Sequence, residues 1–165
     1  MAYRISRNLE ASIIDFLENN LDSDWGNVDV VKTFAEVYGV NMSQSDRNAI
    51  VCVRCGITPH DWVELGSKAT KREPAIIIDL FCANDGQRLD LKDYLIEKLK
   101  NGCAYYKYTI VNGAVDSKVA DGRISLVAPP EDEPIDFNTP KNELEPIDRY
   151  RHRITLRVST GDYES

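Results

Sequence analysis

Apolar residues recur at helical spacing in two stretches of the chain, which predicts two amphipathic helices. Polar residues fill the positions between them, as in a helix with a repeat of about 3.6 residues and one buried side. The buried side of the first helix is formed by Leu9, Ile13, Phe16, Leu17 and Leu21, and that of the second, over residues 90–100, by Leu91, Leu95 and Leu99. Asp90 is expected to cap the start of the second helix, and Gly102 to follow its end.

Most of the remaining apolar residues follow strand patterns. Residues 48–55 lie between polar boundaries and predict a strand, and residues 73–82 form an almost continuous apolar run that is typical of a buried central strand. Residues 28–38 fit either a helix or a strand, and their β-branched side chains favour the strand. Residues 61–66 form a short separate piece, and strands are expected in residues 104–111 and 123–127, with turns at Asn112-Gly113 and Asp121-Gly122.

Residues 149–158 show the cleanest alternation, which predicts a strand with two different faces. One face carries Tyr150, His152, Ile154, Leu156 and Val158, and the other carries Arg149, Arg151, Arg153, Thr155 and Arg157. The preceding segment, residues 128–148, contains five of the seven prolines and seven acidic side chains against one lysine. This segment, hereafter the acidic arm, is expected to be an extended loop, because prolines break regular structure and like charges repel.

Together these elements predict an α+β fold in a single domain covering residues 1–165. The connections between strands are mostly of hairpin length, so the sheet is expected to be mostly antiparallel, with both helices packed on one face. The acidic arm extends from this core, and residues 159–165 are expected to form a flexible C-terminal tail.

Composition narrows the class of protein. Of the 165 residues 42% are hydrophobic and 28% are charged, which is typical of a globular chain and not of a disordered one. No apolar run approaches the roughly 20 residues that span a bilayer, and the N-terminus lacks the apolar core of a signal peptide, so we expect a protein made in the cytoplasm without membrane contact. The formal net charge is −7, of which the acidic arm contributes −6. The nearly neutral body lacks the basic surface of a nucleic-acid binder.

The tetrapeptide Cys52-Val-Arg-Cys55 has the spacing of half a zinc site or of a redox-active dithiol. The four cysteines follow the pattern C-x2-C-x26-C-x20-C, which lacks the second close pair of a zinc ribbon. Side chains three residues apart in a strand point to opposite faces, so the favoured interpretation is two small buried residues of a reducing compartment. The alternative is a zinc-binding regulatory module through these two cysteines.

Asp79 is an acidic residue inside the apolar run of the expected central strand. Burying an unpaired carboxylate costs free energy, so Asp79 is expected to pair with a cationic side chain across the sheet or in a neighbouring subunit. The alternative is a metal-dependent nuclease or hydrolase centred on Asp79 with Glu64 or Glu73. The sequence contains no nucleotide-binding loop, zinc-protease motif, nucleophile elbow or dinucleotide fingerprint, which favours a protein that is not an enzyme and has no catalytic, cofactor-binding or metal-binding residues.

Opposite charges are segregated onto the acidic arm and the arginine face of residues 149–158. That face has three interpretations: a phosphate-binding row, an interface that meets the acidic arm of another copy, or a solvated surface. Head-to-tail contacts between copies of one chain can use such charge segregation. The candidate interface residues are Arg149, Arg151, Arg153, Arg157, Glu131, Asp132, Glu133 and Asp136.

A series of weak motifs resembles one protein family through its order and spacing. The series consists of Ile13-Ile-Asp-Phe-Leu17, Ala49-Ile-Val-Cys-Val-Arg54, Glu64-Leu-Gly-Ser67, residues 77–87 (IIDLFCANDGQ), residues 88–95 (RLDLKDYL) and residues 148–156 (DRYRHRITL). Over residues 9–158 the pattern resembles the tail-terminator and neck proteins of long-tailed bacteriophages. No single motif of the series is catalytic.

The resemblance implies a small antiparallel sheet with two helices on one face and a structural role in the neck of the virion. Such proteins commonly assemble as a ring of six subunits at the head-proximal end of the tail tube, where they stop tube polymerisation. The implied partners are further copies of the chain, the tail tube protein and the head-side connector or stopper protein. DNA passes through the lumen without sequence readout, and an acidic protein suits that passage because it does not retain phosphates. The tail terminator is the favoured member, and a stopper or adaptor is the alternative within the family.

Overall fold

The fold is α+β with a mostly antiparallel sheet, as the sequence predicted. A computed structural model describes residues 5–26, 28–38, 49–66, 68–160 and 163–164. The elements are α1 (Ile5–Asp24), β1 (Asp29–Val31), α2 (Phe34–Tyr38), β2 (Ile50–Cys55), β3 (His60–Trp62), β4 (Thr70–Arg72), β5 (Ala75–Phe81), α3 (Asp85–Leu99), β6 (Cys103–Val111), β7 (Ala114–Leu126), β8 (Glu131–Pro134), the 3-10 turns η1 (Lys141–Glu143) and η2 (Pro146–Asp148), β9 (Arg151–Ser159) and β10 (Tyr163–Glu164).

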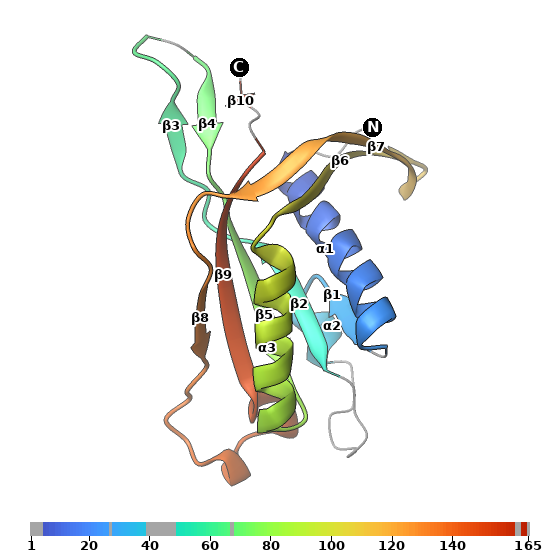
Figure 1. Cartoon of the computed structure of the whole chain (residues 1–165), viewed down its shortest axis with the longest axis vertical. Helices are drawn as coiled ribbons and strands as arrows, with labels where there is room; N and C mark the ends of the chain where they lie inside the picture. The colour runs from blue at the N-terminus through green and yellow to red at the C-terminus, as the bar shows by residue number, and fades with distance from the viewer. Residues whose placement is uncertain (1–4, 27, 39–48, 67, 161–162, 165) are drawn as a thin grey trace.

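The larger sheet has the strand order β1-β2-β5-β9-β7-β6, and β8 pairs with β9 beside this path. Among the described residues, β1–β2 is the only parallel pair of this sheet. β5 lies between β2 and β9 (Figure 1), as expected for its continuous apolar sequence. A smaller sheet of order β10-β4-β3 projects from one end of the molecule (Figure 1).

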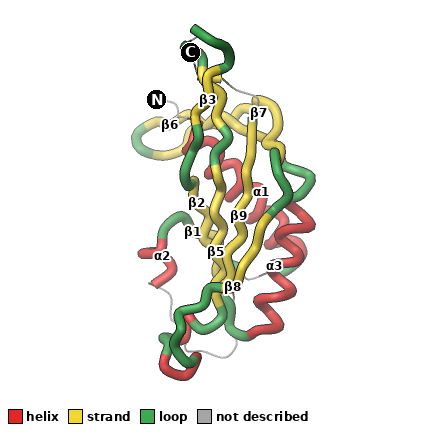
Figure 2. The backbone as a smooth tube through the Cα atoms, turned by 90° about the vertical axis from the view of Figure 1, so that its left-hand side faces the viewer, coloured by secondary structure: helices red, strands yellow, loops and turns green. Residues whose placement is uncertain are grey.

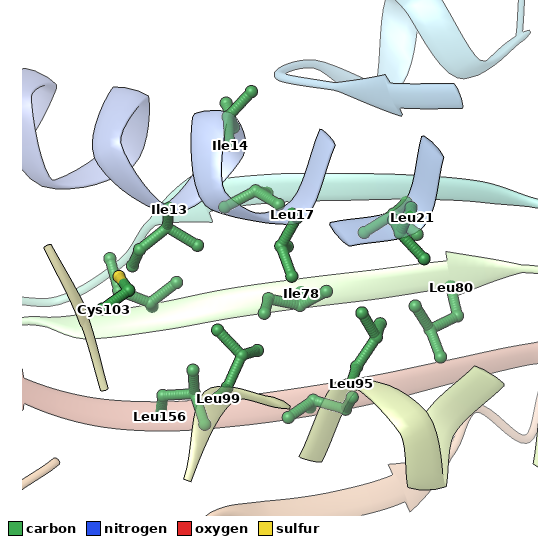
Figure 3. Close-up of a cluster of buried hydrophobic side chains, with 14 of the residues drawn as sticks. Ile13, Ile14, Leu17, Leu21, Ile78, Leu80, Leu95, Leu99, Cys103 and Leu156 are labelled. Atoms are coloured by element: carbon green, nitrogen blue, oxygen red, sulfur yellow. The ribbon is translucent and has the colours of Figure 1, made fainter. Parts of the chain in front are cut away.

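The two long helices, α1 and α3, cover one face of the larger sheet (Figure 2). Their apolar stripes point toward the strands, and Figure 3 shows Leu17 of α1 and Leu95 of α3 on either side of Ile78 in β5. All three side chains are completely buried. Burial of one such side chain contributes roughly 1.5–3 kcal/mol, so this layer is the main source of stability.

In the part of the chain that the structure describes, the opposite face of the sheet is covered over only part of its length. Val37 of α2 and Ile147 of η2 pack there against Ile50, Cys52 and Phe81. Figure 2 shows α2 on the side of the sheet opposite to α1 and α3. The remainder of this face, hereafter the open face, carries charged side chains.

Residues 28–38 differ from the expected strand, because only Asp29–Val31 are extended and α2 follows at once. A reciprocal capping pair starts α2. The Thr33 hydroxyl accepts a hydrogen bond from the backbone N–H of Glu36 at 3.3 Å, and the Glu36 carboxylate accepts one from the N–H of Thr33 at 3.1 Å. This capping box outweighs the local β-branched residues, and its Thr-x-x-Glu spacing is visible in the sequence.

Helix α3 begins at Asp85, so Asp90 lies inside the helix and is not its N-cap. Asn84 is the cap: its Oδ1 accepts from the N–H of Gln87 at 2.8 Å, and Gln87 Oε1 accepts from the N–H of Ala83 at 2.8 Å. Gly102, beyond the helix end, has a φ of 72°, and a Cβ at this position would lie 2.1 Å from the Ile124 carbonyl oxygen. Glycine is therefore required there for both conformation and space.

Strands β6 and β7 form a long hairpin that curves past the sheet near α1 (Figure 1). Its two-residue turn is Asn112-Gly113, as predicted, and both residues have positive φ values of 53° and 81°. Asp121-Gly122 is not a turn but a bulge, which β7 inserts between the partners of Ala104 and Tyr106. β7 is therefore much longer than the strand expected over residues 123–127.

Several segments outside the predicted strands are also extended. The acidic arm contains β8, η1 and η2, and the expected C-terminal tail contributes β10, which pairs with β4. The piece expected over residues 61–66 is β3 followed by the turn to β4. These strands are short, and β8 and β10 are each held by a partner that is distant in sequence, which local patterning does not reveal.

Candidate functional site

The open face carries Asp79 between two arginines. β5 runs between β2 and β9, and this order places the carboxylate within reach of a side chain from each neighbour. Arg54 Nη2 donates to Asp79 Oδ2 at 3.0 Å, and Arg153 Nε donates to Oδ1 at 2.9 Å. The Asp79 side chain has no exposed surface, whereas the two arginine side chains keep 34% and 32%. Asp79 thus meets cations across the sheet, and it meets them within its own chain.

In this geometry Asp79 holds Arg54 and Arg153 in place. Both of its oxygens accept charge-assisted hydrogen bonds, which are the strong ones in proteins. Two positive charges surround one negative charge, so the group retains a net positive charge at the centre of the open face. A carboxylate held in this way fixes Arg54 and Arg153 and is enclosed by them.

Arg151 is buried, whereas each of the three interpretations of the arginine face placed it at a surface. It is 8% exposed, and its guanidinium carbon lies 4.5 Å from the centre of the Phe81 ring, 5.6 Å from that of Phe34 and 5.5 Å from that of Phe137. Its Nη1 also donates to Asp148 Oδ1 at 3.2 Å. A desolvated cation over an aromatic ring contributes about 2 kcal/mol. Arg151 therefore ties α2 and the end of the acidic arm to the sheet.

The acidic arm pairs with β9 of its own chain. β8 runs antiparallel to β9, with Glu131 opposite Thr155 and Glu133 opposite Arg153. The two glutamates share the open face with Arg153, and the group lines a hollow of about 140 Å³. Sequence reasoning considered the arm and the arginine face as partners in different copies, and the structure brings them together within one copy.

A buried histidine ties the arm to the helix side of the sheet. Arg88 Nη1 lies 2.8 Å from His152 Nδ1, and His152 Nε2 lies 2.7 Å from Asp132 Oδ1. A guanidinium only donates, so Nδ1 must accept, and Nε2 carries the proton that is donated to Asp132. This hydrogen bond from His152, helped by the charge of Lys92, lowers the pKa of Asp132.

The remaining candidate interface residues have separate local roles. Arg149 Nε donates to the Leu144 carbonyl at 3.1 Å, and Asp136 accepts from the N–H of Asn138 at 2.8 Å. Arg157 is the exposed member of the four predicted arginines. The predicted stripe is therefore not one continuous charged surface.

The two cysteines of the CVRC motif lie on opposite faces of β2, as strand geometry predicted. Cys52 belongs to the cluster beneath α2, whereas Cys55 packs against the cluster beneath α1 and α3. Burial raises the pKa of the Cys52 thiol to about 11 and also raises the pKa of Cys55. Thiols of raised pKa are weak nucleophiles and weak metal ligands at neutral pH. The two cysteines are therefore not positioned to coordinate one metal ion together.

The acidic residues of the hydrolase alternative are not brought together. Glu73 precedes Asp79 by six residues of nearly extended chain, which separates them by roughly 20 Å, and it pairs with Lys71 at 2.9 Å. Glu64 is exposed in the turn between β3 and β4. Among the residues that the structure describes, no three His, Cys, Asp or Glu side chains are placed to hold a metal ion.

A second surface, which sequence reasoning missed, lies between α1 and the β6–β7 hairpin. It is a groove of about 220 Å³, hereafter the α1–β7 groove, lined by Ala11, Ile14, Asp15, Glu18, Lys32, Tyr108 and Val115. Figure 3 shows Ile14 pointing to the other side of α1 from Ile13 and Leu17. The sequence feature that could have indicated this groove is Ile14, an apolar residue outside the helical stripe that faces the sheet.

No helix in the described part of the chain is long and apolar enough to cross a membrane. A scan against protein-family models finds no family that matches the chain. A comparison with curated protein sequences finds no match either.

Proposed function

We propose that this chain is a non-enzymatic assembly protein of a tailed bacteriophage, and specifically the tail terminator. The observation that carries the proposal is where the motif series falls on the fold. Five of its six members fall on α1, β2, β5 with α3, and β9, and the sixth begins with Glu64 in the turn between β3 and β4. These elements are the two long helices and three adjacent strands of the larger sheet, and the resemblance implies a sheet with two helices on one face.

The buried charged groups support a role in assembly over one in catalysis. Asp79 is enclosed by Arg54 and Arg153, and Arg151 is enclosed by aromatic rings. A catalytic carboxylate or cation needs access to a substrate, and these groups contact other residues of their own chain instead. No observation favours the metal-dependent nuclease or hydrolase.

In the proposed role the protein acts through its surfaces. Copies form a ring. One face of the ring binds the tail tube protein, and the other binds the head-side connector or stopper. The net charge of −7 keeps phosphates from adhering while DNA passes through the lumen. The protein is made in the host cytoplasm and resides in the neck of the virion.

Immunogold electron microscopy of intact particles tests the proposal. A label confined to the collar between head and tail is the expected result, and particles grown without the protein are expected to carry overlong tails. Tails of normal length that fail to join heads would indicate a stopper or adaptor instead. Particles without any label would overturn the structural role altogether.

A further inference from the structure

The β3–β4 hairpin exposes apolar side chains at its tip. Leu65 is fully exposed, Val63 is 47% exposed, and Ile57, just before the hairpin, is 84% exposed. The hairpin projects from one end of the molecule (Figure 1). Single exposed apolar residues are ordinary, but Val63 and Leu65 lie together on one projecting element, which marks an interaction surface.

The α1–β7 groove is the complementary feature, because it is apolar at its floor and already formed. Its walls are fixed to each other: Ser12 Oγ of α1 accepts from the N–H of Tyr106 at 3.0 Å, and Asn8 Oδ1 accepts from the N–H of Tyr108 at 3.2 Å. These bonds also satisfy the outer edge of β6. The other strand of the hairpin, β7, is exposed along residues 114–123 and pairs there on one side only.

Charge favours a basic partner at the groove. Asp15 and Glu18 stand at its rim beside Lys32, and Asp15 is already paired with Lys118 of β7. Burial together with the charges of Asp15 and Asp22 raises the pKa of Glu18, against the opposing charge of Lys32. Beside the hairpin tip, Lys68 is exposed and forms no ion pair with another described residue. A lysine brought beside Glu18 would offset the acidic charge that Asp15 and Asp22 place around this carboxylate.

We propose that the Leu65 tip of one copy docks in the α1–β7 groove of the next copy, with Lys68 beside Glu18. The exposed edge of β7, which contributes Val115 to the groove, offers main-chain hydrogen bonds to the incoming hairpin. Tip and groove are different surfaces of one chain, so the contact is head to tail and repeats from copy to copy. Closure of these contacts into a ring rests on the proposed function.

Two variants test the two halves of the contact separately. Leu65→Glu removes the tip, and Val115→Glu blocks the groove, where 52% of the Val115 side chain is exposed in the free chain. Each is expected to weaken self-association at least about 100-fold, because a carboxylate replaces an apolar side chain in a desolvated contact. Leu89→Glu is the matched control, since Leu89 is 41% exposed on α3, whose start lies at the opposite end of the molecule from the β3–β4 hairpin (Figure 1).

The assay is native mass spectrometry with light scattering, and circular dichroism checks that each variant is folded. Wild type and Leu89→Glu are expected to form the same oligomer, and the two other variants to be monomers. The Leu65→Glu chain keeps its groove and the Val115→Glu chain keeps its tip, so an equimolar mixture is expected to form one-to-one pairs and nothing larger. A face-to-face dimer contact would not give this result.

The outcomes separate this inference from the proposed function. A wild-type chain that stays monomeric at high concentration, or an oligomer that survives both variants, overturns the tip-and-groove contact. A surviving oligomer leaves the ring proposal standing with a different interface. Unlabelled phage particles would overturn the proposed function even if the contact between copies were confirmed.

Discussion

Replacing Asp79 with alanine would leave Arg54 and Arg153 close together without the carboxylate that separates them. In the native chain Asp79 accepts hydrogen bonds of 3.0 and 2.9 Å from the two guanidinium groups and has no exposed side-chain surface. The variant loses both bonds and places two like charges at the centre of the open face. We therefore expect Asp79→Ala to lower the free energy of unfolding substantially.

The magnitude follows from burial. Removing one partner of a buried ion pair costs about 3–5 kcal/mol, because the other charge is left desolvated. Arg54 and Arg153 keep about a third of their side-chain surface, so they regain part of their hydration when Asp79 is lost. The expected loss is accordingly about 3 kcal/mol, which is a large fraction of the roughly 5–15 kcal/mol that stabilises a typical domain.

Urea unfolding followed by circular dichroism measures this loss. The informative control is the triple variant Asp79→Leu, Arg54→Met and Arg153→Met, which removes all three charges and retains volume. It is expected to lose less stability than Asp79→Ala alone, since replacing an entire buried ionic group by apolar side chains is often close to neutral. A loss below about 0.5 kcal/mol for Asp79→Ala would refute this reasoning. Stabilisation of wild type, but not of the variant, by a divalent cation would revive the hydrolase alternative.

Three further predictions concern the helix cap, the acidic arm and the cysteines. Asn84→Ala removes the acceptor for the Gln87 N–H and is expected to lower the free energy of unfolding by about 1 kcal/mol in urea. The hydrogen bond from His152 lowers the pKa of Asp132 below its usual 3.8, so its stabilisation is present above about pH 4 and lost as the pH falls through the folded-state pKa. Asp132→Asn is therefore expected to be less stable than wild type at pH 7, and its free energy of unfolding is expected to fall less on acidification. A difference in free energy of unfolding between the two chains that stays the same at every pH would contradict this. Burial raises the pKa of three thiols to about 11 or 12, namely Cys52, Cys82 and Cys103. Ellman's reagent is therefore expected to react first with Cys55 in the folded chain. Metal analysis is expected to find no bound zinc, because such thiols are weak metal ligands at neutral pH.

The parts of the fold that the sequence revealed are those governed by a single repeating pattern. The stripes of α1 and α3, the apolar run of β5 and the alternation of β9 each concern residues that bury one side of one element. Helix starts were harder, because the side-chain caps at Thr33 and at Asn84 decide where α2 and α3 begin. The Thr-x-x-Glu spacing at α2 could have been recognised, whereas the β-branched valines beside it pointed to a strand.

The candidate site was less predictable because it depends on partners that are distant in sequence. Alternation correctly placed Arg151 and Arg153 on one face of β9, but it does not reveal that Phe34 and Phe137 enclose Arg151. Composition likewise described the acidic arm as a loop. Its short strand exists because β9 offers a free edge at that point, and such a pairing depends on the tertiary fold.

The register between β8 and β9 explains why the acidic arm and the arginines satisfy each other within one chain. Alternate residues of β9 face opposite sides of the sheet, and β8 follows the same alternation. Asp132 therefore meets His152 on the helix side, while Glu131 and Glu133 meet the open face. A slip of one residue would exchange these sides and leave His152 without its acceptor, so this partly buried hydrogen bond favours the observed register. Since these charges are largely committed inside the chain, contacts between copies are better sought at the projecting hairpins, where apolar side chains remain exposed.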